Sequence, residues 1–130
     1  MLVNSDYSGC IENPIYPNET IQILDCQKKY DSTSSFLNKF STQCHTWKLS
    51  YDDILQIIQN REHEDVFDIH NHYNVLPCSY EGHILLKNQK YFFTINAGSF
   101  IILSRNKNDI YYICPNKKLK HLFVTGRFER

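Results

Sequence analysis

The chain has 130 residues, the usual size of one domain, so we expect residues 1–130 to form a single domain. Its apolar fraction of 42% is ordinary for a globular protein, whereas its aromatic fraction of 14% is high and favours a β-rich core. The N-terminus lacks the pattern of a secretory signal, and no run reaches the roughly 20 apolar residues that span a bilayer. Composition therefore predicts a soluble, cytoplasmic protein.

The charges are distributed unevenly along the chain, although the formal net charge is zero. Residues 1–65 carry five bases and ten acids, a net charge of −5, and residues 66–130 carry nine bases and four acids, a net charge of +5. Between these halves, four acids fall within seven residues: Glu62, Glu64, Asp65 and Asp68. A cluster of this kind is suited to a basic protein partner.

The five cysteines are odd in number and widely spaced, at Cys10, Cys26, Cys44, Cys78 and Cys114. No C-x-x-C pair is present, which argues against a disulfide framework and against a zinc knuckle. We therefore expect free, mostly buried thiols, although folding can bring one distant pair together.

In chain order, residues 5–18 contain glycine and prolines and predict an irregular lead-in. Residues 20–26 alternate apolar and polar side chains, as a strand does. Apolar residues then recur at helical spacing over residues 36–40, and Ser34 or Ser35 is suited to cap a short helix there.

The clearest helix signal lies at residues 51–60. Ser50 occupies the N-cap position, and Asp52 and Asp53 favour the positive end of the helix dipole. In residues 65–73 the apolar side chains follow neither the helical nor the strand period, and we expect a strand or an extended segment there.

Residues 75–124 alternate short apolar runs with turn residues, which predicts four or five antiparallel strands. We expect a tight hairpin at Asn88–Gln89, with Asn88 in the left-handed conformation, a bulge or turn at Gly98, and the last connection to begin at Pro115. The predicted fold is α+β, with one or two helices packed on an antiparallel β-meander of four to six strands. The N-terminal half is helical or irregular, and the C-terminal half is the meander.

Two histidines give the only hint of a metal site. On a strand, His70 and His72 would point to one face, where Asp68, Cys78 or His83 could complete a ligand set. Zinc sites usually have two short ligand spacings, and here there is only one, so we favour polar surface histidines and expect no metal or cofactor.

A second hypothesis is that the protein is a metal-free ribonuclease or other hydrolase. It would use His70 or His72 together with His121, one imidazole removing a proton while the other donates one, with help from Lys118 or Lys120. Nothing in the sequence places these residues together, so we expect the protein not to be an enzyme.

A nucleic-acid-binding module is a third reading, based on the basic C-terminal region from Arg105 to Arg130. This region holds seven bases and two acids, which is dilute for a nucleic-acid arm. Binding would require these bases on one face together with stacked aromatic side chains. We therefore regard nucleic acid as an unlikely partner.

Several short motifs follow one another between residues 44 and 124. They are His45-x-Trp47-x-Leu49-Ser50, Asp53-Ile54-x-x-Ile57-Ile58, Tyr73-Asn74-Val75-Leu76-Pro77-Cys78-x-Tyr80-x-Gly82, Lys90-Tyr91-x-Phe93-x-Ile95-Asn96-Ala97-Gly98-Ser99, Tyr111-Tyr112-x-Cys114 and His121-Leu122-Phe123. This succession resembles immunity proteins of polymorphic toxin systems, of the contact-dependent growth inhibition type. The resemblance implies a non-catalytic protein that binds and blocks a cognate toxin domain, often a nuclease, in sibling cells.

The resemblance carries over no toxin-binding residue, because the toxin-facing positions of such proteins vary. Immunity proteins against nucleases are commonly acidic, whereas this chain is neutral, so either its acidic half alone faces the toxin or the toxin is not strongly basic. We therefore hypothesise that the acidic residues before the meander contact a basic toxin. These residues are Asp52, Asp53, Glu62, Glu64, Asp65 and Asp68.

Overall fold

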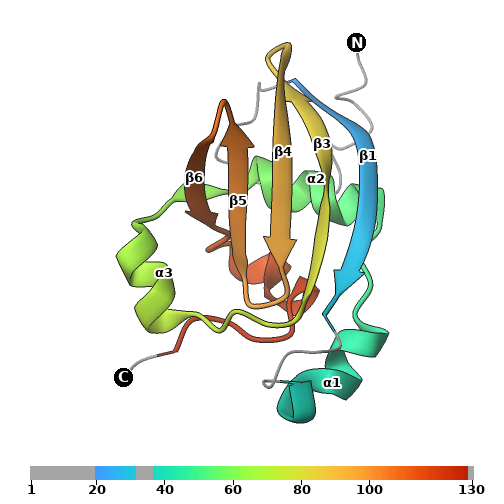
Figure 1. Cartoon of the computed structure of the whole chain (residues 1–130), viewed down its shortest axis with the longest axis vertical. Coiled ribbons are helices and arrows are strands. Elements are labelled where there is room, and N and C mark those ends of the chain that lie inside the picture. The colour runs from blue at the N-terminus through green and yellow to red at the C-terminus, as the bar shows by residue number, and fades with distance from the viewer. Residues whose placement is uncertain (1–19, 32–36, 129–130) are drawn as a thin grey trace.

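The structure is a computed structural model that describes residues 20–31 and 37–128. A six-stranded antiparallel sheet has the strand order β1-β3-β4-β5-β6-β2, with α2 on one face and α3 at its β6 side (Figure 1). The strands are β1 (Ile21–Tyr30), β2 (Glu62–His63), β3 (Cys78–Leu86), β4 (Gln89–Asn96), β5 (Phe100–Arg105) and β6 (Asn108–Ile113). The helices are α1 (Leu37–Thr46), α2 (Tyr51–Gln59), α3 (Val66–His72) and a 3-10 helix, η2 (Lys117–Leu122). The predicted α+β fold with an antiparallel meander is confirmed. The predicted lead-in over residues 5–18 and the proposed cap at Ser34 or Ser35 lie outside the described residues.

The strands β3, β4, β5 and β6 form the meander through three tight turns. Lys87 and Asn88 make the first turn with φ of 50° and 68°, and Asn106 and Lys107 make the last with φ of 55° and 67°. Two consecutive left-handed residues give the turn that matches the twist of a hairpin. The predicted left-handed Asn88 is confirmed, while the turn itself lies one residue earlier than expected.

The first strand, β1, pairs with β3 at one edge of the sheet, so the strand predicted at residues 20–26 is confirmed and continues to Tyr30. Its register shifts between Ile23 and Asp25, which is the mark of a β-bulge. Because of the bulge, Ile23 and Cys26 both pack against the core, although they are three positions apart along the strand.

Helix α2 begins with the capping box that the sequence predicts. The Ser50 hydroxyl accepts a hydrogen bond from the Asp53 backbone N–H at 3.0 Å, and the Asp53 carboxylate accepts one from the Ser50 N–H at 2.9 Å. The helix buries Ile54, Ile57 and Ile58 in the main core, on the face of the sheet that carries Ile84, Phe93, Ile95, Ile101 and Leu103. A helix predicted from local signals alone is thus confirmed.

Residues 66–72 form helix α3, so the strand or extended segment expected at residues 65–73 is wrong. The Asp65 carboxylate accepts a hydrogen bond from the Phe67 backbone N–H at 2.8 Å and caps the helix. Ile69 and Tyr73 then pack on Phe100 in a second, smaller cluster. Phe100 neighbours Ile101 on β5, whose side chain lies in the main core, so the two clusters occupy opposite faces of the sheet.

The end of the chain and the cysteines also differ from expectation. Residues 117–122, which continue the apolar pattern of the meander, form η2 instead of a further strand, and Pro115 lies in the connection between β6 and η2, as predicted. Cys44 and Cys78 form a disulfide between α1 and β3, so the expectation of free thiols is wrong for this pair. Cys26 and Cys114 are free and partly buried. The sequence could not reveal the pair because the two cysteines are 34 residues apart.

Candidate protein-binding surface

The six acidic residues that the sequence singles out fall into two groups at opposite ends of α2. Asp52 and Asp53 lie in its first turn, where α2 contacts β1, and Asp53 is engaged in the capping box. The Asp52 carboxylate accepts a hydrogen bond from the Gln56 amide at 2.7 Å. Helix α2 crosses behind the sheet toward β6, so these two residues are separated from the rest (Figure 1).

The other four acids come together around β2 and α3. The strand β2 pairs with the end of β6, and the Glu64 N–H donates to the Tyr111 carbonyl at 2.9 Å. The chain then enters α3 at once, so the acids lie along one edge of the molecule. They are Glu62, Glu64, Asp65 and Asp68, and Asp109 on β6 lies beside them.

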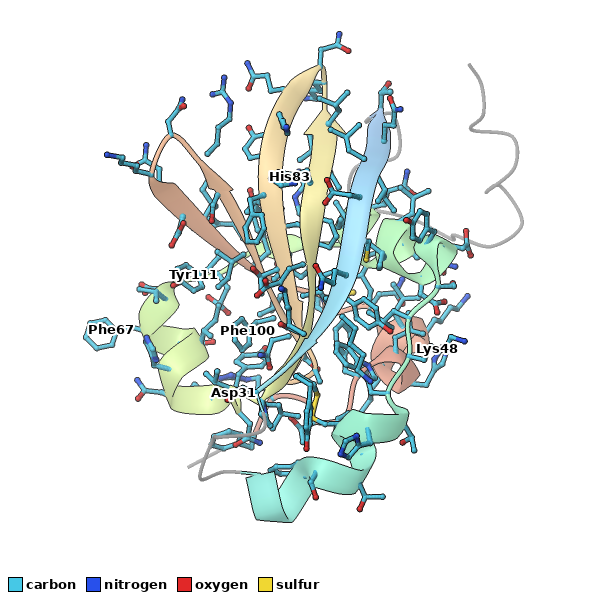
Figure 2. The ribbon with its side chains drawn as sticks, turned by 45° about the vertical axis from the view of Figure 1, so that its right-hand side comes forward. Asp31, Lys48, Phe67, His83, Phe100 and Tyr111 are labelled. Carbon is cyan, nitrogen blue, oxygen red and sulfur yellow. A yellow bond between two sulfur atoms is a disulfide. The ribbon has the colours of Figure 1, made fainter. Side chains whose placement is uncertain are left out.

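Two apolar side chains of α3 stand among these acids, whereas Ile110 on β6 shares the sheet face of its partner Leu103, opposite to the face that α3 covers. Phe67 is 75% exposed, Val66 is 40% exposed and Ile110 is 38% exposed. Figure 2 shows Phe67 projecting from α3 away from the sheet, while Tyr111 and Phe100 lie on the strands behind it. We refer to this surface as the α3 edge, made of Glu62, Glu64, Asp65, Val66, Phe67, Asp68 and Asp109.

A hollow of about 370 Å³ lies within the α3 edge. Its lining comes from the β2–α3 connection on one side and from β6 on the other. The lining residues are His63, Glu64, Asp65, Val66, Asp109, Ile110 and Tyr111. Carboxylates and apolar groups therefore share one concave surface, as at interfaces with a desolvated centre and a charged rim.

Contacts at both ends hold α3 in place. Asp68 pairs with Arg127 at 3.5 Å and lies 3.6 Å from the His72 ring, one turn along the helix. The His72 ring lies 2.9 Å from the Phe128 carbonyl oxygen, and the Phe128 N–H donates to the His72 carbonyl at 2.8 Å. The C-terminal segment thus anchors α3, and Phe67 is presented on a fixed element.

Charged side chains of both signs lie around Tyr73, the residue at the C-terminal cap of α3. Burial raises the pKa of the Tyr73 hydroxyl, and the carboxylates Asp68, Glu64 and Glu62 raise that pKa further, against the opposing effect of Arg127. A nearby negative charge disfavours the phenolate in this way. Three carboxylates of the α3 edge thus lie close enough to Tyr73 to act on its hydroxyl, as does Arg127.

The histidines considered for a hydrolase site and for a metal site do not converge. His70 and His72 lie on a helix, so they do not share a strand face as expected, and the His72 ring faces the C-terminal segment. His121 lies on η2, whose Leu122 packs against the main core on the other side of the sheet. Within residues 20–31 and 37–128, no group of three or more His, Cys, Asp or Glu side chains is arranged to hold a metal ion.

The basic C-terminal residues do not form one face. Arg105 and Lys107 lie at the β5–β6 turn, where Arg105 stacks over the Tyr91 ring at 5.9 Å. The lysines of η2 lie near the opposite end of the strands (Figure 1), and Arg127 is paired with Asp68. The positions of these basic residues therefore give no support to the hypothesis of a nucleic-acid-binding module.

The face of the sheet opposite to α2 carries an aspartate–histidine pair that the sequence does not reveal. The Asp25 carboxylate accepts a hydrogen bond from the His83 backbone N–H at 3.0 Å and lies 3.1 Å from His83 Nδ1. The His83 ring packs edge-on against Phe92, and Figure 2 shows His83 in the middle of the strands. Because Asp25 and His83 are 58 residues apart, only the pairing of β1 with β3 brings them together.

Comparison with protein-family models, with curated proteins and with solved structures gives no match. Among the described helices, none has both the length and the apolar character needed to cross a membrane.

Proposed function

We propose that this protein is a non-catalytic immunity protein that binds a cognate toxin domain, a nuclease in the simplest case, and so protects the cell that produces it. The observation that carries the proposal is the α3 edge, where two exposed apolar side chains of α3, Val66 and Phe67, stand among five carboxylates from α3, its N-terminal connection and β6. The sequence resemblance to immunity proteins supports the same role.

The chemistry of the α3 edge fits a basic protein. Nucleases bind polyanions, so their active-site surfaces are positively charged. A partner of this kind would be drawn to the acidic rim, while the apolar side chains would supply the desolvated contact that gives affinity. A neutral chain can serve this role because its acids are gathered at one edge.

Charge reversal at the α3 edge tests the proposal. The variant carries Glu62→Lys, Glu64→Lys and Asp65→Asn, because Asn keeps the helix cap at residue 65 while removing its charge. The cognate toxin domain is to be sought in the reading frame directly upstream. We expect the variant to bind that domain more weakly than the wild type, with a smaller dependence of binding on salt. Calorimetric titration at two salt concentrations measures both.

A control variant carries Asp52→Lys and Glu81→Lys, a similar change in charge outside the α3 edge. It should bind like the wild type. Unchanged affinity of the α3-edge variant would rule out this placement of the interface, whereas absence of binding by the wild type would rule out the immunity role.

Neutralisation of a nuclease would take place in the cytoplasm, and we propose that compartment for the protein. The Cys44–Cys78 disulfide bears on this, because disulfides persist in oxidising compartments and are rare in the cytosol. A cytoplasmic role therefore requires that the fold persist when these two cysteines are reduced.

A further inference from the structure

The exposure of Phe67 has a definite geometric origin. Along α3, Ile69 and Tyr73 are one turn apart and point to the sheet, where they pack on Phe100. Phe67 falls on the opposite side of the helix and is 75% exposed, the largest exposed fraction among the large apolar residues that the structure describes. The fold therefore gains little from this ring.

A phenylalanine in water forgoes a favourable burial. Full burial of such a side chain stabilises a protein by about 1.5–3 kcal/mol relative to exposure. Phe67 follows Val66, which lines the hollow, so the two exposed apolar side chains of α3 adjoin a concave surface. A grouped apolar patch of this kind marks an interaction site more often than a single exposed residue does.

We propose that Phe67 is the anchor residue of the α3 edge and enters an apolar pocket with a basic rim on a partner protein. Val66 adjoins the anchor, and the carboxylates of Glu62, Glu64 and Asp65 meet the basic rim. This inference rests on the proposed function in one respect, which is that the toxin domain is the partner.

The charges select this occupant over two others. A second copy of the chain, related by a two-fold axis, would place the same carboxylates against each other. An anionic lipid surface attracts basic segments, whereas this surface is acidic. A basic protein is the partner that the carboxylates favour.

The fixed position of α3 makes Phe67 effective as an anchor. The Asp65 cap, the Asp68–Arg127 pair and the contacts between His72 and Phe128 hold the helix before any partner arrives. Binding then requires little ordering of the backbone, and preorganised aromatic side chains are typical of hot spots.

Tyr51 offers a matched control on the same molecule. It is 60% exposed and stands beside Asp52 at the start of α2, so it too is an exposed aromatic residue next to acids. It lies at the other end of α2, away from the α3 edge. Its replacement tests whether any exposed aromatic residue would serve.

The experiment titrates the purified, catalytically inactivated toxin domain of the upstream reading frame with wild type, Phe67→Ala and Tyr51→Ala. We expect Phe67→Ala to weaken binding about 30-fold or more, as loss of a hot spot does, and Tyr51→Ala to change it by less than about three-fold. Both variants should unfold at the temperature of the wild type, because both side chains are exposed.

Each other outcome overturns the inference in a distinct way. If wild type binds and Phe67→Ala binds equally well, the anchor is wrong while the proposed function stands. If wild type does not bind the toxin domain, both fail. Dimerisation of wild type in sedimentation, or binding to vesicles of anionic lipid, that is lost in Phe67→Ala would assign the anchor to a second copy or to a membrane instead.

Discussion

Gly82 lies where β1 and β3 approach each other at the bulge. A Cβ atom at this position would lie 2.0 Å from the carbonyl oxygen of Asp25 and 2.9 Å from the Cα of Cys26. Both neighbours are backbone atoms, so they cannot rotate away as a side chain would. The absence of a side chain at residue 82 thus permits the bulge that sets the Asp25–His83 pair.

We expect Gly82→Ala to lower the free energy of unfolding by about 1–3 kcal/mol, because β1 has to shift to accept the methyl group. Gly126→Ala is the control, since a Cβ there meets no atom within 4 Å. Denaturant unfolding followed by circular dichroism measures both variants. Equal stability of the two would show that β1 does not run this close to β3.

The two free thiols that the structure describes differ from reactive cysteines. Burial raises the pKa of Cys114 from 9.0 to about 12, against a smaller opposing effect of a backbone hydrogen bond from Asn116. Burial also raises the pKa of Cys26, and the neighbouring Asp25 charge adds to that rise. Since the thiolate is the reactive form, both residues should be slow nucleophiles.

We expect iodoacetamide at pH 8 to modify Cys114 about 1000-fold more slowly in the folded protein than in the unfolded protein, because each pKa unit lowers the thiolate fraction about tenfold. The rate should keep rising as the pH increases from 9 toward 12. Peptide mass mapping after timed alkylation gives the rate at each cysteine. A rate that levels off near pH 9 would contradict the raised pKa.

At the scale of elements, α2 and α3 show what the sequence could and could not predict. Ser50 and Asp53 form a local capping box, and the apolar residues that follow keep the helical period, so α2 was predictable from its own residues. Helix α3 has only seven residues, and its position depends on packing against Phe100 on a strand about 30 residues away. Tertiary contacts of this kind leave no local signal.

The cysteines and the candidate site also include some features that the local sequence predicts and others that depend on the fold. Four of the five acids of the α3 edge were recognisable as a cluster in sequence, whereas Asp109 joins them only through the fold. Phe67 was not recognisable, because its exposure depends on which face α3 turns to the sheet. The Cys44–Cys78 pair and the Asp25–His83 pair each join segments that only the sheet brings together. Turn residues such as Asn88 were predictable because their conformational preference is local.

The Cys44–Cys78 disulfide gives a prediction about α1 and its attachment. The Lys28 ammonium also holds the end of this helix, donating to the Cys44 carbonyl at 2.7 Å and to the Trp47 carbonyl at 2.6 Å. We expect the variant Cys44→Ala/Cys78→Ala to fold, with its free energy of unfolding lowered by about 2–4 kcal/mol. Thermal and denaturant unfolding measure this loss, and an unfolded variant would contradict a role in a reducing cytoplasm.

At the scale of the whole molecule, the sheet separates the main core from the cluster that supports α3. One face of the sheet packs on α2 and η2 in the main core. The other face supports α3 near β6, through the smaller cluster. In the proposed function, the meander is the scaffold and the α3 edge beside it is the surface that meets the partner. The motifs that resemble immunity proteins lie mostly in the scaffold, while the proposed contact lies between them.

Growth protection tests this account most directly. Cells that express the toxin domain of the upstream reading frame are supplied with wild type, with the α3-edge variant Glu62→Lys/Glu64→Lys/Asp65→Asn, or with Tyr51→Ala, at equal soluble levels. We predict that wild type and Tyr51→Ala restore growth and that the α3-edge variant does not. Failure of wild type to protect, or full protection by the α3-edge variant, would contradict the account.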